Sequence, residues 1–294
     1  SFHTSDLDDF IVRKKDLSPT FMFANAIDDS LMGVNIVLRG DDHLSNTPRQ
    51  IALLQALNLE IPEFIHVALF TGDDGAPLSK RNGSLSVKEL REIGYFPQAV
   101  INYLSRVGHT ISDNELRNIH ELSSVFNISN ISTSPSKIDH TQLNFWQKNV
   151  IESISIEELS SWLESSLEDL PKDVNKDSFV GLIRDNITFP ADAVRYLKNL
   201  FINPLDSEKE VEDLIKQTGS DFFKVAEKII EDNWGDWPKI MKLIGEETGA
   251  KGKNLFMPIR ASITGQLSGP ELDQVIEVMG LERVLRRLQE ASTL

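Results

Sequence analysis

The chain has 294 residues, 40% of them hydrophobic, which is enough for two or three domains with proper cores. No apolar run approaches the roughly 20 residues that span a bilayer, and zero cysteines exclude disulfides and thiolate metal sites. The net charge of −15 argues against indiscriminate nucleic-acid binding, which requires clustered Lys and Arg. We therefore expect a cytoplasmic monomer without membrane contact, in which any nucleic acid binds through a local basic face.

Up to residue 94 the pattern mixes strands with helices. Residues 34–38 predict a short β-branched strand that ends at Arg39. Thr47 and Pro48 predict a helix N-cap followed by Pro at the first helical position, and the helix has an apolar face formed by Ile51, Leu53, Leu54 and Leu57. Residues 66–70 predict a buried second strand. This order predicts the closing half of a parallel α/β sheet, whose ligands collect at the C-terminal ends of the strands.

A glycine-framed loop over residues 72–83 follows the second strand and contains Ser-Lys-Arg. Ser86 and Glu89 then form a capping box that predicts the start of a helix. Adjacent cations at the exit of a strand suit the binding of phosphate, because Lys and Arg donate charge-assisted hydrogen bonds to its oxygens. Taken alone, the loop favours a solvated surface turn, and it is not a P-loop because it lacks a Gly-Lys-Ser/Thr ending.

Beyond Pro97 the pattern is almost entirely helical. Amphipathic periodicity predicts helices over residues 97–107, 191–201, 208–217, 222–231 and 271–279. A second capping box, formed by Ser155 and Glu158, predicts the start of another helix. Residues 127–136 are rich in Asn, Ser and Thr and predict a loop.

Three blocks of the N-terminal part, taken in order, resemble the second half of the catalytic domain of bacterial glutamyl-tRNA synthetase, a class I aminoacyl-tRNA synthetase. They cover residues 18–33, 34–50 and 72–83, and Leu78-Ser79-Lys80-Arg81 resembles the family's version of the class I KMSKS loop. Residues 251–261 resemble a segment of the family's anticodon-binding region. The family's HIGH motif is not found, since none of the six histidines lies in a His-x-Gly-His context. We therefore expect the chain to be the C-terminal portion of a longer enzyme.

The resemblance implies an α/β Rossmann-type catalytic half-domain, the second half of that domain, over residues 1–96. A helical stem-contact and junction region over 97–170 and an all-helical anticodon-binding region over 171–294 would follow. The implied reaction is ATP-dependent attachment of L-glutamate to tRNA-Glu through glutamyl-adenylate, with Mg²⁺ beside ATP; charging of tRNA-Gln stays open. We expect this chain alone to be inactive. A non-catalytic tRNA-binding or interaction protein derived from a synthetase remains the alternative.

The resemblance also assigns the residues of the nucleotide site. It places ATP at Leu78, Ser79, Lys80 and Arg81. Lys80 and Arg81 would be catalytic, with the Lys80 ammonium held against the β- and γ-phosphates as pyrophosphate leaves and Arg81 assisting.

Arg39 matches the family arginine that pairs with the side-chain carboxylate of glutamate. A bidentate guanidinium–carboxylate pair distinguishes glutamate from its uncharged amide. A structural salt bridge with Asp41 or Asp42 is the alternative role for Arg39. Phe21, the second glutamate-binding residue, stands where the family usually has a tyrosine, so it keeps the aromatic wall and loses the hydroxyl.

Cations near the C-terminus are the predicted tRNA contacts. They are Lys251, Lys253 and Arg260, and the basic face extends to Arg283, Arg286 and Arg287. The alternative, that all six are ordinary solvated surface cations without a ligand, accounts for them equally well. Asp41, Asp42 and His43 are predicted to cap a turn rather than to hold a metal ion, and no protein metal site is predicted.

Overall fold

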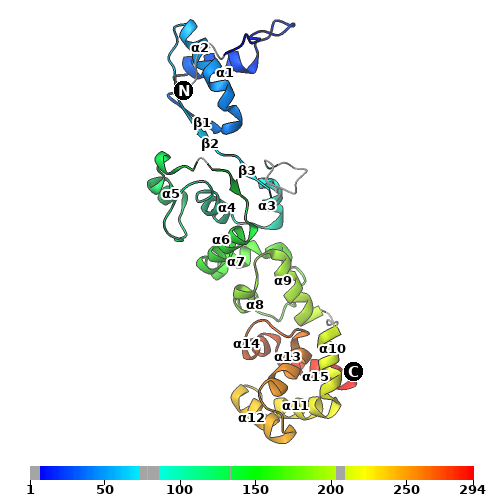
Figure 1. The fold of residues 1–294 in the computed structure, drawn as a ribbon. Coiled ribbons are helices and arrows are strands. Elements are labelled where there is room, and N and C mark those ends of the chain that lie inside the picture. Colours follow the sequence, from blue (N-terminus) through cyan, green and yellow to red (C-terminus); the bar gives the residue numbers. More distant parts are fainter. Residues whose placement is uncertain (1–6, 73–77, 79–85, 133, 203–208) are drawn as a thin grey trace. The chain divides into compact units, whose positions relative to one another are not determined.

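The computed structural model describes residues 7–72, 78, 86–132, 134–202 and 209–294 (Figure 1). The chain divides into two compact units. Unit 1 comprises Ser1–Glu89 and Pro97–Leu143, and unit 2 comprises Leu90–Phe96 and Asn144–Leu294. The predicted domain boundaries after residues 96 and 170 are not tested by this division and stay predictions. In the described ranges, no helix has the length and apolar character required to cross a membrane.

Unit 1 begins with a parallel strand pair and its crossover. The elements in order are α1 (Phe21–Leu31), β1 (Ile36–Gly40), the 3-10 helix η2 (Asp41–Asn46), α2 (Thr47–Ala56) and β2 (Glu63–Val67). Strand β1 pairs in parallel with β2, and Arg39 lies opposite His66 in the register. Helices α1 and α2 pack against each other (Figure 1). Leu54 of α2 is fully buried. The predicted strand–helix–strand unit is therefore confirmed.

The second predicted strand differs from its prediction in two ways. Instead of one strand over 66–70, the chain forms β2 up to Val67 and a separate β3 (Phe70–Thr71). Strand β3 pairs in parallel with β4 (Ser136–Lys137), whose first residue is the last residue of the segment predicted to be a loop. Most of the side chains of β2 and β3 are only half-buried. The prediction of a buried strand was wrong because each sheet has only two strands within the described residues, which leaves its faces partly uncovered.

The rest of unit 1 is helical and irregular. Helix α3 (Val87–Ile93) begins in unit 1 and continues into unit 2 from Leu90. It opens at the predicted capping box: Ser86 N donates to Glu89 Oε2 at 2.6 Å, and Glu89 N donates to Ser86 Oγ at 3.2 Å. Helix α4 (Pro97–Leu104) ends three residues earlier than predicted. It is followed by α5 (Ile119–Val125) and the 3-10 helix η4 (Ile128–Asn130).

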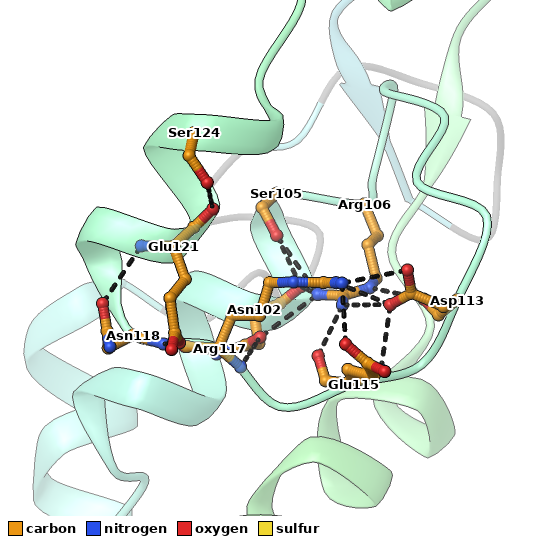
Figure 2. A network of polar contacts seen from close by, with 9 residues as sticks. All are labelled: Asn102, Ser105, Arg106, Asp113, Glu115, Arg117, Asn118, Glu121 and Ser124. Carbon is orange, nitrogen blue, oxygen red and sulfur yellow. Dashed lines mark hydrogen bonds and ion pairs between the residues drawn. The ribbon is translucent and has the colours of Figure 1, made fainter.

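A polar network holds the irregular segment between α4 and α5 (Figure 2). The fully buried Asn102 donates from Nδ2 to Arg117 O at 2.7 Å and accepts from Arg117 N at 3.0 Å. The Arg117 guanidinium donates to both Asp113 oxygens, at 2.5 and 3.0 Å. Arg106 donates to the backbone oxygens of Asp113 and Glu115 at 3.3 and 2.8 Å. Side chains thus replace the regular backbone hydrogen bonds that this segment lacks.

Unit 2 is built from helices, as predicted. Its first helix is α6 (His140–Ser153), which begins in unit 1 and enters unit 2 at Asn144. The other larger helices are α7 (Ile156–Trp162), α8 (Lys176–Ile183), α9 (Pro190–Leu197), α10 (Lys209–Thr218), α11 (Ser220–Asp232), α12 (Trp237–Thr248), α13 (Lys253–Thr264), α14 (Leu272–Met279) and α15 (Leu281–Thr293). The 3-10 helices η5 (Glu164–Ser166) and η6 (Arg184–Asn186) and the π-helix η7 (Lys198–Ile202) connect them. Helix α7 has the predicted capping box at Ser155. A continuous core that includes Phe179, Phe223 and Leu288 joins these helices.

Candidate functional site

Polar side chains gather where the parallel strands of unit 1 end. Arg39 is the penultimate residue of β1, and His66 holds the same place in β2. Thr47 starts α2 and lies between them: its Oγ1 is 2.8 Å from Arg39 Nη2 and 2.9 Å from His66 Nε2. These ends of parallel strands are where α/β folds bind ligands. The structure therefore places Arg39 at the edge of the sheet that the sequence predicts.

The surroundings of Arg39 favour a role other than a structural salt bridge. Its guanidinium carbon lies 5.0 Å from the centre of the Phe64 ring, and its Nε is buried without a hydrogen-bond partner among the described residues. Within the same residues no carboxylate lies within 4.0 Å of Arg39. Partial burial lowers the pKa of Arg39, while the charges of Asp29 and Asp42 raise it. An arginine in this setting stays charged and can pair with an added anion.

Phe21 borders this group through His43. It is the first residue of α1, its side chain is 62% exposed, and its ring centre is 5.9 Å from that of His43. His43 Nδ1 in turn accepts a hydrogen bond from Asn46 Nδ2 at 3.1 Å. Asp41, Asp42 and His43 begin the 3-10 helix η2, but its N-cap is Gly40 and no side chain caps it, so the predicted capping role was wrong. In the parts of the chain that the structure describes, no group of three or more metal-ligating side chains could hold an ion.

Four residues of the site were not predicted from the sequence. Thr47 was expected to cap α2, but the N-cap is Asn46 and the Thr47 hydroxyl bonds to Arg39 and His66 instead. Gln50, 1% exposed, donates from Nε2 to Asn25 Oδ1 at 3.0 Å and so orients the Asn25 amide. The Gln50 Oε1 atom is buried without a partner in the described part. Only pairing of the two strand ends could have indicated His66, because its sequence context reads as ordinary strand.

The predicted nucleotide loop is described at one of its four positions. The Leu78 backbone N–H donates to Phe70 O at 3.0 Å, which ties the end of the loop to β3. Ser79, Lys80 and Arg81 lie outside the described residues. Their predicted roles stay predictions.

Two of the predicted tRNA contacts, Lys251 and Lys253, lie at the start of α13 in unit 2, and the third, Arg260, lies in the second half of that helix. Lys251 and Lys253 are exposed on either side of Gly252, which has a φ of 55°. Arg260 is half-buried and donates from Nη1 to Pro270 O at 2.9 Å. The two lysines are therefore accessible, whereas Arg260 has a structural contact within unit 2.

The wider basic face was predicted wrongly at Arg287. Its side chain is 3% exposed, and Nη2 donates to Asn199 O at 2.6 Å. Burial lowers the pKa of Arg287, and Glu290 lies 3.5 Å away. Arg283 donates from Nη2 to both carboxylate oxygens of Asp173, each at 2.8 Å. Amphipathic packing turns this side of α15 toward the core, so Arg287 cannot meet a phosphate.

Comparisons with known proteins identify the family. Residues 1–145 match the model for the catalytic domain of class I tRNA synthetases (E and Q), and residues 155–292 match that for an anticodon-binding domain. The chain is 44% identical over 293 residues to glutamate–tRNA ligase 1 of Halorhodospira halophila and 43% identical over 289 residues to glutamate–tRNA ligase 2 of Nitrosococcus oceani. These matches cover 100% and 98% of this chain but only 61% of each relative.

A solved structure shares the fold. The crystal structure of a glutamate tRNA ligase from Elizabethkingia meningosepticum matches 99% of this chain and 63% of its own, with a TM-score of 0.85 and 24% identity. The predicted fold class, a partial Rossmann-like catalytic domain followed by a largely helical anticodon-binding domain, is thus confirmed. By the two family models and these relatives, the chain belongs to the class I glutamyl-tRNA synthetase family.

Proposed function

We propose that this chain is part of a glutamate–tRNA ligase, which joins L-glutamate to tRNA-Glu at the expense of ATP. The chain spans about three fifths of its relatives' length, so the activity belongs to a protein that also has the remaining part. The observation that carries the proposal is Arg39, a partly buried guanidinium at the edge of a parallel sheet with no carboxylate partner among the described residues. The proposed domains are 1–96 for catalysis, 97–170 for stem contact and 171–294 for the anticodon.

Arg39 would select the amino acid by its charge. The side-chain carboxylate of glutamate can accept two hydrogen bonds from one guanidinium, whereas the amide of glutamine offers one acceptor and no charge. A site that presents a guanidinium without a carboxylate partner therefore favours glutamate over its amide. Phe21 and His43 would form the aromatic side of this site.

The first chemical step would activate the α-carboxylate. One of its oxygens attacks the α-phosphorus of ATP, the bond from that phosphorus to the β-phosphate bridge breaks, and pyrophosphate leaves. Lys80 and Arg81, with Leu78 and Ser79 in the same loop, would stabilise the charge that gathers on the departing phosphates. Mg²⁺ would accompany ATP, but the described residues present no protein ligand set for an ion, and no step here depends on one.

The second step would transfer glutamate to tRNA. A hydroxyl of the terminal ribose attacks the carbonyl carbon of the adenylate, its proton is lost, and AMP leaves. Unit 2 would hold the distant part of the tRNA through Lys251 and Lys253, with Arg260 as the third predicted contact. A strongly acidic chain requires such contacts to be local.

Charging of bulk tRNA with labelled glutamate tests the proposal. The assay compares this chain with a full-length form that has the missing part of its relatives, and labelled glutamine serves as the control amino acid. Charging with glutamate by the full-length form supports the ligase. Binding of tRNA without charging by either form would instead support the non-catalytic tRNA-binding protein.

A further inference from the structure

Arg39, Thr47 and His66 form a row of three hydrogen-bonded side chains, with Arg39 and His66 at its two ends. The proposed function gives no role to His66. The parallel register sets Arg39 opposite His66, so both side chains lie on the same face of the sheet. Thr47 Oγ1 bridges them, at 2.8 Å from Arg39 Nη2 and 2.9 Å from His66 Nε2. The Phe64 ring supports the guanidinium at 5.0 Å.

The distances between the donors and acceptors of these three side chains favour one ordered arrangement. A guanidinium has only donors, so Thr47 Oγ1 accepts from Arg39. The Thr47 hydroxyl can then donate to His66 Nε2, provided that the imidazole is neutral and has its proton on Nδ1. The other acceptor near this hydroxyl, the backbone oxygen of His43, is 3.5 Å away. Every hydrogen bond thus runs from Arg39 through Thr47 to His66.

A protonated His66 would disrupt this arrangement. It would donate from Nε2, so that Thr47 would accept twice and a second cation would stand beside Arg39. The charged and titratable groups that face His66 are Arg39 on β1 and Asp41 and His43 on η2. Burial, Arg39 and His43 lower the pKa of His66 below its usual 6.5, and Asp41 opposes them. These surroundings therefore favour the neutral imidazole.

We propose that His66 is a positioning residue which, through Thr47, fixes the orientation in which Arg39 receives the carboxylate of the substrate. The inference rests on the proposed function, because it assumes that Arg39 binds a carboxylate. A guanidinium held in advance loses less conformational freedom when the ligand binds. Only neutral His66 can accept the hydrogen bond from the Thr47 hydroxyl that keeps Arg39 in this orientation.

The first test uses the 294-residue chain and needs no activity. Nitrogen-15 NMR of the imidazole reports the tautomer and the protonation of His66. We expect a proton on Nδ1 and an accepting Nε2, loss of this preference in Thr47→Val, and a higher His66 pKa in Arg39→Met. A proton on Nε2 in the wild type, or the same tautomer in Thr47→Val, would overturn the inference.

The second test measures charging kinetics in the full-length form. Loss of one hydrogen bond that orients a charged group corresponds to about a tenfold change. His66→Leu should raise the KM for glutamate about tenfold and leave the KM for ATP unchanged. His66→Gln, which offers an amide oxygen to Thr47, should restore most of the loss. His120→Leu, on the exposed surface of α5, is the matched control.

The pH profile separates positioning from a structural role. In the wild type, the KM for glutamate should rise as the pH falls below 6.5, and this rise should be absent in His66→Gln. Equal losses in His66→Leu and His66→Gln, or equal changes in both KM values, would contradict the inference. If the wild type charges no glutamate at all, the proposed function fails, and the NMR result alone decides whether His66 orients Arg39.

Discussion

The side-chain amide of Gln147 is hydrogen-bonded to the backbone at Phe96. Gln147 Oε1 accepts from Phe96 N at 2.9 Å, and Nε2 donates to Gly94 O and to Thr188 O, each at 3.1 Å. The side chain is fully buried. One glutamine of α6 thus satisfies three backbone groups from two irregular segments of unit 2.

Gln147→Leu should destabilise the protein strongly. Leucine fills a similar volume, but the three backbone groups lose their partner, and each unsatisfied buried group costs roughly 1–3 kcal/mol. Because the surrounding backbone can relax in part, the total cost is smaller than the sum for three unsatisfied groups. We expect a loss of about 3 kcal/mol in the free energy of unfolding. Urea denaturation measures it, with Gln142→Leu on the exposed side of α6 as the control. Equal midpoints for the two variants would show that the amide contributes little.

Asp113 should link stability to acid. Hydrogen bonds from Arg117 are the main cause that lowers the pKa of Asp113 to about 2. A carboxyl whose pKa is depressed in the folded state stabilises it above the unfolded pKa, and this stabilisation is lost as the pH falls through the folded pKa. Asp113→Asn should therefore be less stable than the wild type at pH 6, and the difference should vanish between pH 4 and about pH 2. Thermal unfolding of the wild type and of Asp113→Asn as a function of pH measures this difference in stability, and Asp232→Asn is the control. If the difference between the two proteins stayed the same at every pH, the depressed pKa of Asp113 would be contradicted.

Arg39→Lys should weaken selection of glutamate in the full-length form. A lysine ammonium cannot form the planar bidentate pair, and its charged nitrogen lies at a different distance from the backbone than the guanidinium nitrogens do. We expect kcat/KM for glutamate to fall about a hundredfold, the equivalent of a charged hydrogen bond of roughly 3 kcal/mol. Steady-state charging measures it, and Arg195→Lys, on the exposed surface of α9, is the control. An unchanged kcat/KM would exclude Arg39 from the carboxylate site.

Lys80→Ala should abolish adenylate formation by the full-length form. Removal of one preorganised contact to a transition-state charge typically costs about 3–4 kcal/mol of barrier. Affinity for tRNA should stay nearly unchanged, because the proposed tRNA contacts Lys251, Lys253 and Arg260 lie in unit 2, far along the chain from Lys80. Exchange of labelled pyrophosphate into ATP in the presence of tRNA, together with a tRNA binding isotherm, measures both. Wild-type exchange would refute the role of Lys80.

Lys251 and Lys253 should contribute to tRNA binding through charge. Each alanine substitution should weaken binding and reduce the slope of log affinity against log salt concentration by about one. Both side chains are exposed, so thermal stability should not change. Lys242→Ala, with an exposed side chain on α12, provides the control. An unchanged salt slope in both variants would move the tRNA site away from the start of α13.

The sequence by itself determined the helical character of the chain beyond Pro97, the parallel strand pair and the position of Arg39 at a strand end. These features depend on local signals: hydrophobic periodicity, the capping boxes at Ser86 and Ser155, and β-branched runs. Such signals act between residues close in the chain, so the sequence displays them directly. The order of the motifs also indicated the synthetase family, because several blocks in one order are specific.

Only the tertiary structure decided what surrounds Arg39 and which cations are exposed. The bridge from Arg39 through Thr47 to His66 depends on the register of two strands that are separated by a helix. The burial of Arg287 depends on packing between helices distant in the sequence. Composition and periodicity do not show which polar groups pair in the folded protein. Such pairings arise when segments distant in the sequence pack together and compete for the same polar groups.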